Sequence, residues 1–190
     1  MKKNNLFIIS GPSGAGEDSI IDGLEKILPV ERVITTTTRR LRPGEKSGKP
    51  YYFINRDRFI KLIKEKKFFE YAKEYNNNYY GVTNNEISRI IANGKIGLWK
   101  IEYKGVITAK KLMPEIIAIF INAPLEILEK RIRKRDKITE KFVQERLEYT
   151  KEWLKHLEIY DYIVENEEGK LNQTIAKVAG IIRKNHQTGC

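Results

Sequence analysis

The chain has 190 residues, of which 41% are hydrophobic and 32% charged, and this composition indicates a folded globular protein. Its formal net charge of +11 suits polyanionic ligands such as nucleotides, although a solvated, lysine-rich surface would give the same excess. A single cysteine, Cys190, excludes an internal disulfide and a cysteine-based metal cluster, and no apolar run reaches membrane-spanning length, so we expect a cytoplasmic protein.

The chain begins with a predicted strand, a glycine-rich loop and a helix. The apolar run at 6–10 is typical of a buried parallel strand, and residues 19–28 carry apolar side chains at helical spacing until Pro29. Between them, residues 11–19 read Gly-Pro-Ser-Gly-Ala-Gly-Glu-Asp-Ser. The backbone N–H groups of such a loop, together with the N-terminus of the following helix, can bind phosphate without any charged side chain.

The loop departs from the phosphate-binding pattern G-x-x-x-x-G-K-[S/T] at two positions. Gly11 and Gly16 have the required spacing, but Glu17 stands where lysine belongs and Asp18 where the hydroxyl belongs. The strand and helix on either side favour a phosphate loop over an ordinary glycine-containing turn. The residues expected to contact a nucleotide here are Gly11, Ser13, Gly14, Ala15, Gly16, Glu17, Asp18 and Ser19.

The next fifty residues, about 33–82, predict a mostly β lobe inserted after the first strand–helix unit. Arg39 and Arg42 lie on a Gly/Pro-containing loop, and with the hydroxyl of Tyr51 they could surround a phosphate dianion. The Glu70 carboxylate could accept hydrogen bonds from guanine N1–H and the exocyclic amine, which adenine cannot supply. The expected elements are strands at 33–38 and 51–54, a helix at 57–66, and paired strands at 68–75 and 78–80.

The remainder of the chain alternates helices with apolar strands. A capping box, Thr83 with Glu86, opens a helix that ends near Gly94. Strands alternating with helices predict an α/β fold with a parallel sheet covered on both faces. The further elements expected are strands at 96–101, 116–121 and 162–164 and helices at 105–113, 125–135, 139–157 and 171–184.

Taken in order, these motifs resemble those of the guanylate kinase family from Leu6 to the final helix. The resemblance rests on four motifs: the glycine loop, the Thr-Thr-Arg-x-x-Arg-x-Gly-Glu run followed by Tyr51, Phe-x-Glu at 68–70 and Asn-Tyr-Tyr-Gly at 78–81. The resemblance implies a P-loop NTPase-type parallel sheet flanked by helices. It also implies a single domain with a core at 1–32 and 83–190, an inserted GMP-binding lobe at about 33–82, and a helical lid at about 125–150.

The resemblance implies an enzyme, a monomer or homodimer, that moves the γ-phosphoryl group of ATP to GMP or dGMP with Mg²⁺. Thr35 and Glu70 would read the guanine, while Val82 stands where the family usually has a Ser or Thr that contacts the base. Lid arginines would neutralise charge on the transferring phosphoryl group. The substrate-binding residues implied are Thr35, Arg39, Arg42, Tyr51, Glu70, Tyr80 and Glu102, and the lid residues are Arg131, Arg135 and Arg146.

A second departure stands at the end of the strand at 96–101. Glu102 matches the second acid of the family pattern, but Lys100 replaces the first, so the loop and this strand have exchanged charges. We therefore expect Lys100 to supply the missing ammonium as a catalytic residue, and Asp18 to supply oxygen to Mg²⁺. The alternative is a Glu17–Lys100 salt bridge that plugs an inactive site.

Other functions remain open from the sequence. An inactive member of the family could bind GMP or a phosphorylated protein segment through the arginines of the inserted lobe. A kinase with another acceptor, such as a sugar phosphate, is disfavoured by Glu70. A nucleic-acid binder is disfavoured because the basic residues follow nucleotide-site positions and no stacking-aromatic motif is evident.

Overall fold

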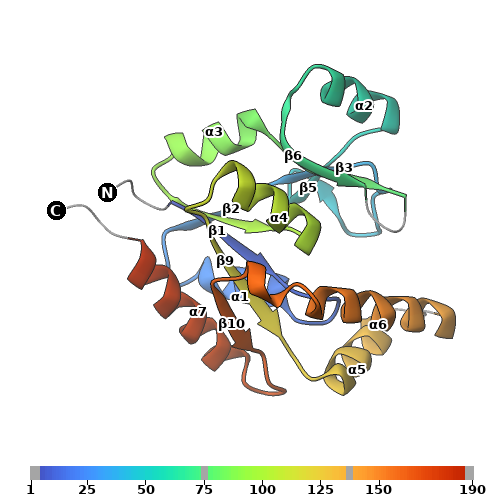
Figure 1. The fold of residues 1–190 in the computed structure, drawn as a ribbon, viewed down its shortest axis with the longest axis vertical. Coiled ribbons are helices and arrows are strands. Elements are labelled where there is room, and N and C mark those ends of the chain that lie inside the picture. Colours follow the sequence, from blue (N-terminus) through green and yellow to red (C-terminus); the bar gives the residue numbers. More distant parts are fainter. Residues whose placement is uncertain (1–4, 74–76, 136–138, 187–190) are drawn as a thin grey trace.

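The computed structural model describes residues 5–73, 77–135 and 139–186, which form two five-stranded sheets with helices around them (Figure 1). The first sheet is parallel throughout, as predicted, and places β1 at its centre. In spatial order its strands are β10 (Tyr162–Glu165), β9 (Ile117–Asn122), β1 (Leu6–Ser10), β8 (Ile96–Lys100) and β2 (Val30–Arg32).

Helices cover both faces of this sheet because successive residues of its strands point to opposite sides. Phe7 and Ile9 pack with the helices of one face, whereas Leu6 and Ile8 pack with those of the other, and all four are buried. The first face holds α1 (Glu17–Leu24), α5 (Leu125–Arg135) and α7 (Leu171–Asn185). The second holds α3 (Asn84–Ala92), α4 (Tyr103–Leu112) and α6 (Glu140–Leu154).

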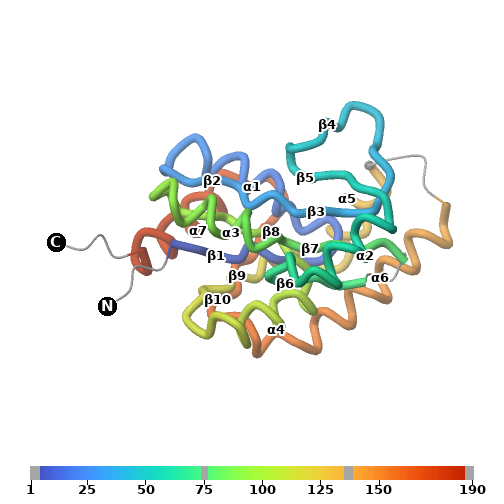
Figure 2. Tube along the Cα trace, turned by 90° about the horizontal axis from the view of Figure 1, so that it is seen from above, coloured from blue at the N-terminus to red at the C-terminus, as the bar shows by residue number. Residues whose placement is uncertain are grey.

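The second sheet lies beside the carboxyl end of the first and combines parallel and antiparallel pairs (Figure 2). Its helix, α2 (Arg56–Lys64), is fixed by Phe59, whose ring stacks on Phe68 with 4.3 Å between centroids. In spatial order its strands are β4 (Lys46–Ser47), β5 (Pro50–Phe53), β3 (Thr35–Thr37), β7 (Tyr79–Thr83) and β6 (Phe68–Lys73).

Some predicted boundaries were wrong. Helix α1 begins at Glu17 rather than at 19, because Gly16 adopts φ 97° and the helix starts directly after it. The helix ends at Leu24, where helix to 28 was predicted. Strand β2 was missed, since three residues are too short for a periodic pattern. The capping box is half formed: Thr83 caps Glu86 N, but the Glu86 carboxylate accepts from Ile34 N and Arg89 instead.

Helix α6 ends at Leu154, and a 3₁₀ turn follows at Leu157–Ile159 where the sequence predicted helix to 157. Across the ranges 5–73, 77–135 and 139–186, no helix is long and apolar enough to cross a membrane.

Candidate active site

The candidate site is a cavity of about 310 Å³ at the carboxyl ends of β1 and β8, where the parallel sheet meets the second sheet. The parallel register pairs Ile9 with Lys100, so the strand end carrying Lys100 lies beside the loop that follows Ser10. Ligands in open α/β sheets bind at this edge. The predicted site residues that line the cavity are Gly11, Ser13, Gly14, Glu17, Asp18, Thr35, Arg39, Arg42, Tyr51, Glu70, Tyr80, Lys100, Glu102 and Arg146.

The glycine loop turns tightly between β1 and α1. Gly14 and Gly16 have φ of 91° and 97°, a left-handed conformation that favours glycine. A Cβ at Gly11 would lie 2.5 Å from the Ile121 carbonyl oxygen, so only glycine fits there. Because α1 starts immediately after Gly16, its N-terminal N–H groups lie at the loop, which is the arrangement that binds anions.

Two carboxylates and two cations meet at the start of α1. Lys100 Nζ lies 2.6 Å from Asp18 Oδ2, and Arg32 Nη1 lies 2.8 Å from Asp18 Oδ1. In the structure Lys100 forms an ion pair with Asp18, while Glu17 is buried beside them with 8% of its surface exposed. Acidic residues in the first turn stabilise a helix N-terminus, but they would repel phosphate unless cations offset them.

The charges of this cluster fix its protonation state. Burial opposes the ionised form of Asp18, yet Lys100 and Arg32 outweigh it and lower the Asp18 pKa to about 2. Burial likewise opposes the ammonium of Lys100, but the negative charges of Glu17 and Asp18 hold its pKa above the ordinary value. Lys100 is thus a cation at neutral pH, with 27% of its side chain exposed toward solvent.

The second sheet contributes a basic and aromatic end to the cavity. Arg39 forms a two-point ion pair with Glu45, at 2.7 and 3.0 Å, and its guanidinium lies 5.4 Å from the Tyr51 ring centroid. Glu45 also accepts from the Arg42 backbone N–H at 2.8 Å, which ties the loop together. The rings of Tyr51 and Tyr80 meet edge-on at 6.1 Å.

Glu70 and Thr35 lie deeper, and both are buried. Burial raises the pKa of the Glu70 carboxyl to about 7, so it exchanges its proton near neutral pH. Gly105 of α4 allows this packing, since a Cβ there would lie 3.0 Å from Glu70 Oε1. Burial disfavours the ionised carboxylate unless hydrogen-bond donors accompany it. A ligand with two adjacent N–H donors would therefore stabilise the ionised form of Glu70.

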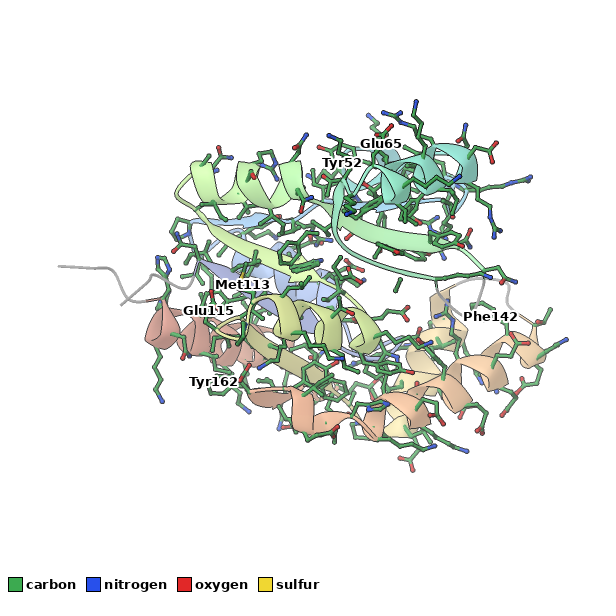
Figure 3. The ribbon with its side chains drawn as sticks, turned by 45° about the horizontal axis from the view of Figure 1, so that its top comes forward. Tyr52, Glu65, Met113, Glu115, Phe142 and Tyr162 are labelled. Carbon is green, nitrogen blue, oxygen red and sulfur yellow. The ribbon has the colours of Figure 1, made fainter. Side chains whose placement is uncertain are left out.

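Helix α6 closes the cavity and contacts both of its ends. Arg146 Nη1 donates to Ser13 Oγ of the loop at 3.0 Å, while the Tyr149 hydroxyl donates to Glu102 Oε2 at 2.8 Å. The Arg146 guanidinium lies 5.0 Å from the ring centroid of Phe142, which Figure 3 labels near the N-terminal end of α6. One helix face therefore joins the loop to the side of the cavity that carries Glu102.

Several predicted residues lie outside the cavity lining. Arg131 donates to the backbone carbonyls of Gly14 and Asn166, at 3.1 and 3.0 Å, and so braces the loop. Ala15 is buried in the core and Ser19 is exposed. Gly16 packs against Asn166, whose amide would lie 2.6 Å from a Cβ at that position. The side chain of Arg135 and residues 74–76, which include the end of the strand predicted at 68–75, lie outside the described part of the chain.

Val82 is buried in the hydrophobic core with Ile87 and Trp99. The base contact that a Ser or Thr would make at this position is therefore not available from Val82.

Three contributors were missed in the sequence. Asn166 Nδ2 donates to the Ala15 carbonyl at 2.7 Å and so fastens the loop, Tyr149 holds Glu102, and Arg32 holds Asp18. Tyr149 and Arg32 belong to no local motif. Glu45, by contrast, stood inside the quoted arginine motif, and its spacing from Arg39 and Arg42 could have indicated an ion pair.

The comparisons with known proteins agree with one another. A family model described as guanylate kinase matches residues 3–185. A guanylate kinase of Shewanella violacea is 35% identical over 98% of the chain and 90% of that protein, and one of Rickettsia felis is 37% identical over 95% and 93%. The crystal structure of guanylate kinase from Anaplasma phagocytophilum superposes with a TM-score of 0.78 at 26% identity, covering 98% of this chain and 89% of that one.

Proposed function

The chain belongs to the guanylate kinase family, and on that premise we propose that it transfers the γ-phosphoryl group of ATP to GMP or dGMP. The observation that carries this proposal is the cavity of about 310 Å³. It brings the glycine loop, the paired Arg39 and the buried Glu70 together beneath Arg146 of α6. A donor phosphate site and an acceptor nucleotide site would thus share one cavity.

The reaction needs positioning and charge more than covalent chemistry. An oxygen of the GMP phosphate attacks the γ-phosphorus of ATP, the bond from that phosphorus to the β,γ-bridging oxygen breaks, and GDP and ADP leave. Arg39, Arg42 and the Tyr51 hydroxyl would hold the GMP phosphate, and ionised Glu70 would accept from the guanine edge. Arg146 would neutralise charge beside the loop.

Within this reaction, we propose that Lys100 replaces the loop lysine. Its ammonium lies at the loop edge of the cavity, 2.6 Å from Asp18, and the neighbouring carboxylates keep it charged. A bound polyphosphate would offer Lys100 several negative oxygens in place of one carboxylate. The reciprocal placement of Glu17 and Lys100 supports an exchange of charges rather than the loss of one.

For magnesium, Asp18 is the candidate ligand among the residues that line the cavity. Among the described residues, no three His, Cys, Asp or Glu side chains are grouped to hold a metal ion. Kinases nevertheless hold Mg²⁺ through one or two carboxylates, with phosphate oxygens and waters as the other ligands. Asp18, which stays ionised, suits that demand, with Glu17 next to it. Bound Mg²⁺ would supply neutralisation of the phosphate oxygens.

The test is ADP formation from ATP and Mg²⁺, measured with GMP, with dGMP, with AMP and without acceptor. We expect ADP only with the two guanine acceptors, because Glu70 discriminates against adenine. GMP binding without ADP formation would instead support an inactive binding module, the alternative function of this cavity. Equal rates with AMP would contradict the assignment of Glu70.

A further inference from the structure

Arg32, at the end of β2, does not line the cavity of about 310 Å³ but contacts Asp18, which does. It lines a neighbouring cavity of about 430 Å³, and from there its guanidinium donates to Asp18 Oδ1 and to Asp22 Oδ1, at 2.8 and 3.0 Å. Its side chain is 14% exposed, whereas Asp22 is 66% exposed. Arg32 is therefore a largely enclosed cation whose less exposed partner is Asp18, with 38% of its side chain exposed.

The Asp18 carboxylate is shared between two cations that approach from opposite sides. Arg32 takes Oδ1, which leaves Oδ2 directed at Lys100 inside the phosphate cavity. A planar guanidinium bound to Asp18 and Asp22, one turn apart on α1, restricts the rotation of the carboxylate. Arg32 thus holds the Asp18 carboxylate so that its other oxygen faces Lys100 in the cavity.

The sharing also changes the cost of moving Lys100. If Lys100 alone neutralised Asp18, its transfer to a phosphate would leave an unpaired carboxylate beside a polyanion, and the repulsion would oppose binding. With Arg32 in place, Asp18 keeps an opposite charge after Lys100 has moved. The departure of Lys100 is then an exchange of partners rather than the loss of one.

From this geometry we propose that Arg32 is a positioning residue for the donor: it holds Asp18 so that Lys100 can be released to the phosphates of ATP. The inference rests on the proposed function of Lys100. Arg32 touches neither nucleotide in this account and acts through Asp18.

The test is calorimetric titration with β,γ-imido ATP in EDTA, which removes any contribution of metal, and separately with GMP. For Arg32→Met and Arg32→Gln we expect binding of the ATP analogue to weaken at least about tenfold. These variants leave Asp18 without the cation that lies 2.8 Å from its Oδ1, and one charge–charge interaction at such a distance corresponds to more than about a tenfold change in affinity. GMP binding should stay within about twofold, since Arg32 lies outside the cavity that Arg39 and Glu70 line.

Two controls separate charge from folding. Arg32→Lys should recover part of the lost analogue affinity, because it keeps the cation although it lacks the planar guanidinium that joins Asp18 to Asp22. Asp22→Asn should bind like the wild type, since it removes only the exposed partner. Unchanged GMP affinity certifies the fold of each variant. Wild-type analogue affinity in both neutral Arg32 variants, or an Arg32→Lys variant as weak as Arg32→Met, would overturn the inference.

Lys100→Ala distinguishes this inference from the function on which it rests. If Lys100→Ala binds the analogue as tightly as the wild type, the relocated lysine itself is refuted. If Lys100→Ala is weakened and the neutral Arg32 variants are not, only the assignment of Arg32 fails.

Discussion

Replacing Glu70 with glutamine tests how the cavity reads a guanine. With the Glu70 pKa at about 7, the carboxylate that accepts two N–H donors is roughly one-tenth populated at pH 6 and nine-tenths at pH 8. Wild-type affinity for guanosine should therefore fall about tenfold between pH 8 and pH 6. Glu70→Gln has no carboxylate to titrate, so its binding should be weak and independent of pH.

Titration calorimetry with guanosine, which carries no titrating phosphate, measures this directly. Tm and GMP binding at pH 8 serve as checks on the folded state of the variant. A wild-type affinity that is flat from pH 6 to pH 8 would refute the reasoning, as would a pH dependence that survives in Glu70→Gln.

The raised pKa of Glu70 also makes the stability of the folded protein depend on pH. The folded state holds the Glu70 proton up to about pH 7, whereas the unfolded chain releases it near 4.5, so wild-type stability falls as pH rises through this window. The loss amounts to about 3 kcal/mol at pH 8. Urea unfolding should show that the free energy of unfolding of Glu70→Gln, relative to that of the wild type, increases from pH 5 to pH 8. A difference that stays constant over this range would contradict a raised pKa of the buried Glu70 carboxyl.

Three other variants, two single and one double, test the remaining parts of the site. Glu45→Gln removes the charged partner of Arg39, so KM for GMP should rise about three- to tenfold with KM for ATP unchanged; an equal rise in both would contradict this. Asn166→Ala leaves the Ala15 carbonyl without this donor, so urea unfolding should show a loss of about 1–3 kcal/mol and kinetics a raised KM for ATP; wild-type values for both would show that the bond is dispensable. Glu17→Lys combined with Lys100→Asp should turn over faster than the two single variants predict together; strict additivity would mean that the two positions are not coupled.

The architecture could be predicted because its signals are local. The apolar run of β1, the glycines that follow it and the alternation of helices with strands each follow from spacing along the chain. The arginine motif was found in the same way, since Arg39, Arg42 and Glu45 are neighbours both in sequence and in the cavity. The exchange of charge between loop and strand was visible only because both positions fall in recognisable patterns.

The remaining contacts depend on the register of distant segments. Arg32 reaches Asp18 because β2 pairs with β8 at the edge of the sheet, and Asn166 reaches Ala15 across 151 positions in sequence. Arg131 shows the limit of spacing arguments. Its place on α5 was predicted, but whether that helix face would meet the ligand or the loop carbonyls depends on how α5 packs.

The most direct test of the account is GDP formation from ATP, GMP and Mg²⁺ by Lys100→Ala, compared with Lys104→Ala, which removes an exposed ammonium four residues further along. We expect the wild type and Lys104→Ala to form GDP at similar rates, and Lys100→Ala to lose about two or more orders of magnitude in kcat while calorimetry shows that it still binds GMP. Wild-type turnover by Lys100→Ala would contradict the claim that Lys100 supplies the ammonium missing from the glycine loop.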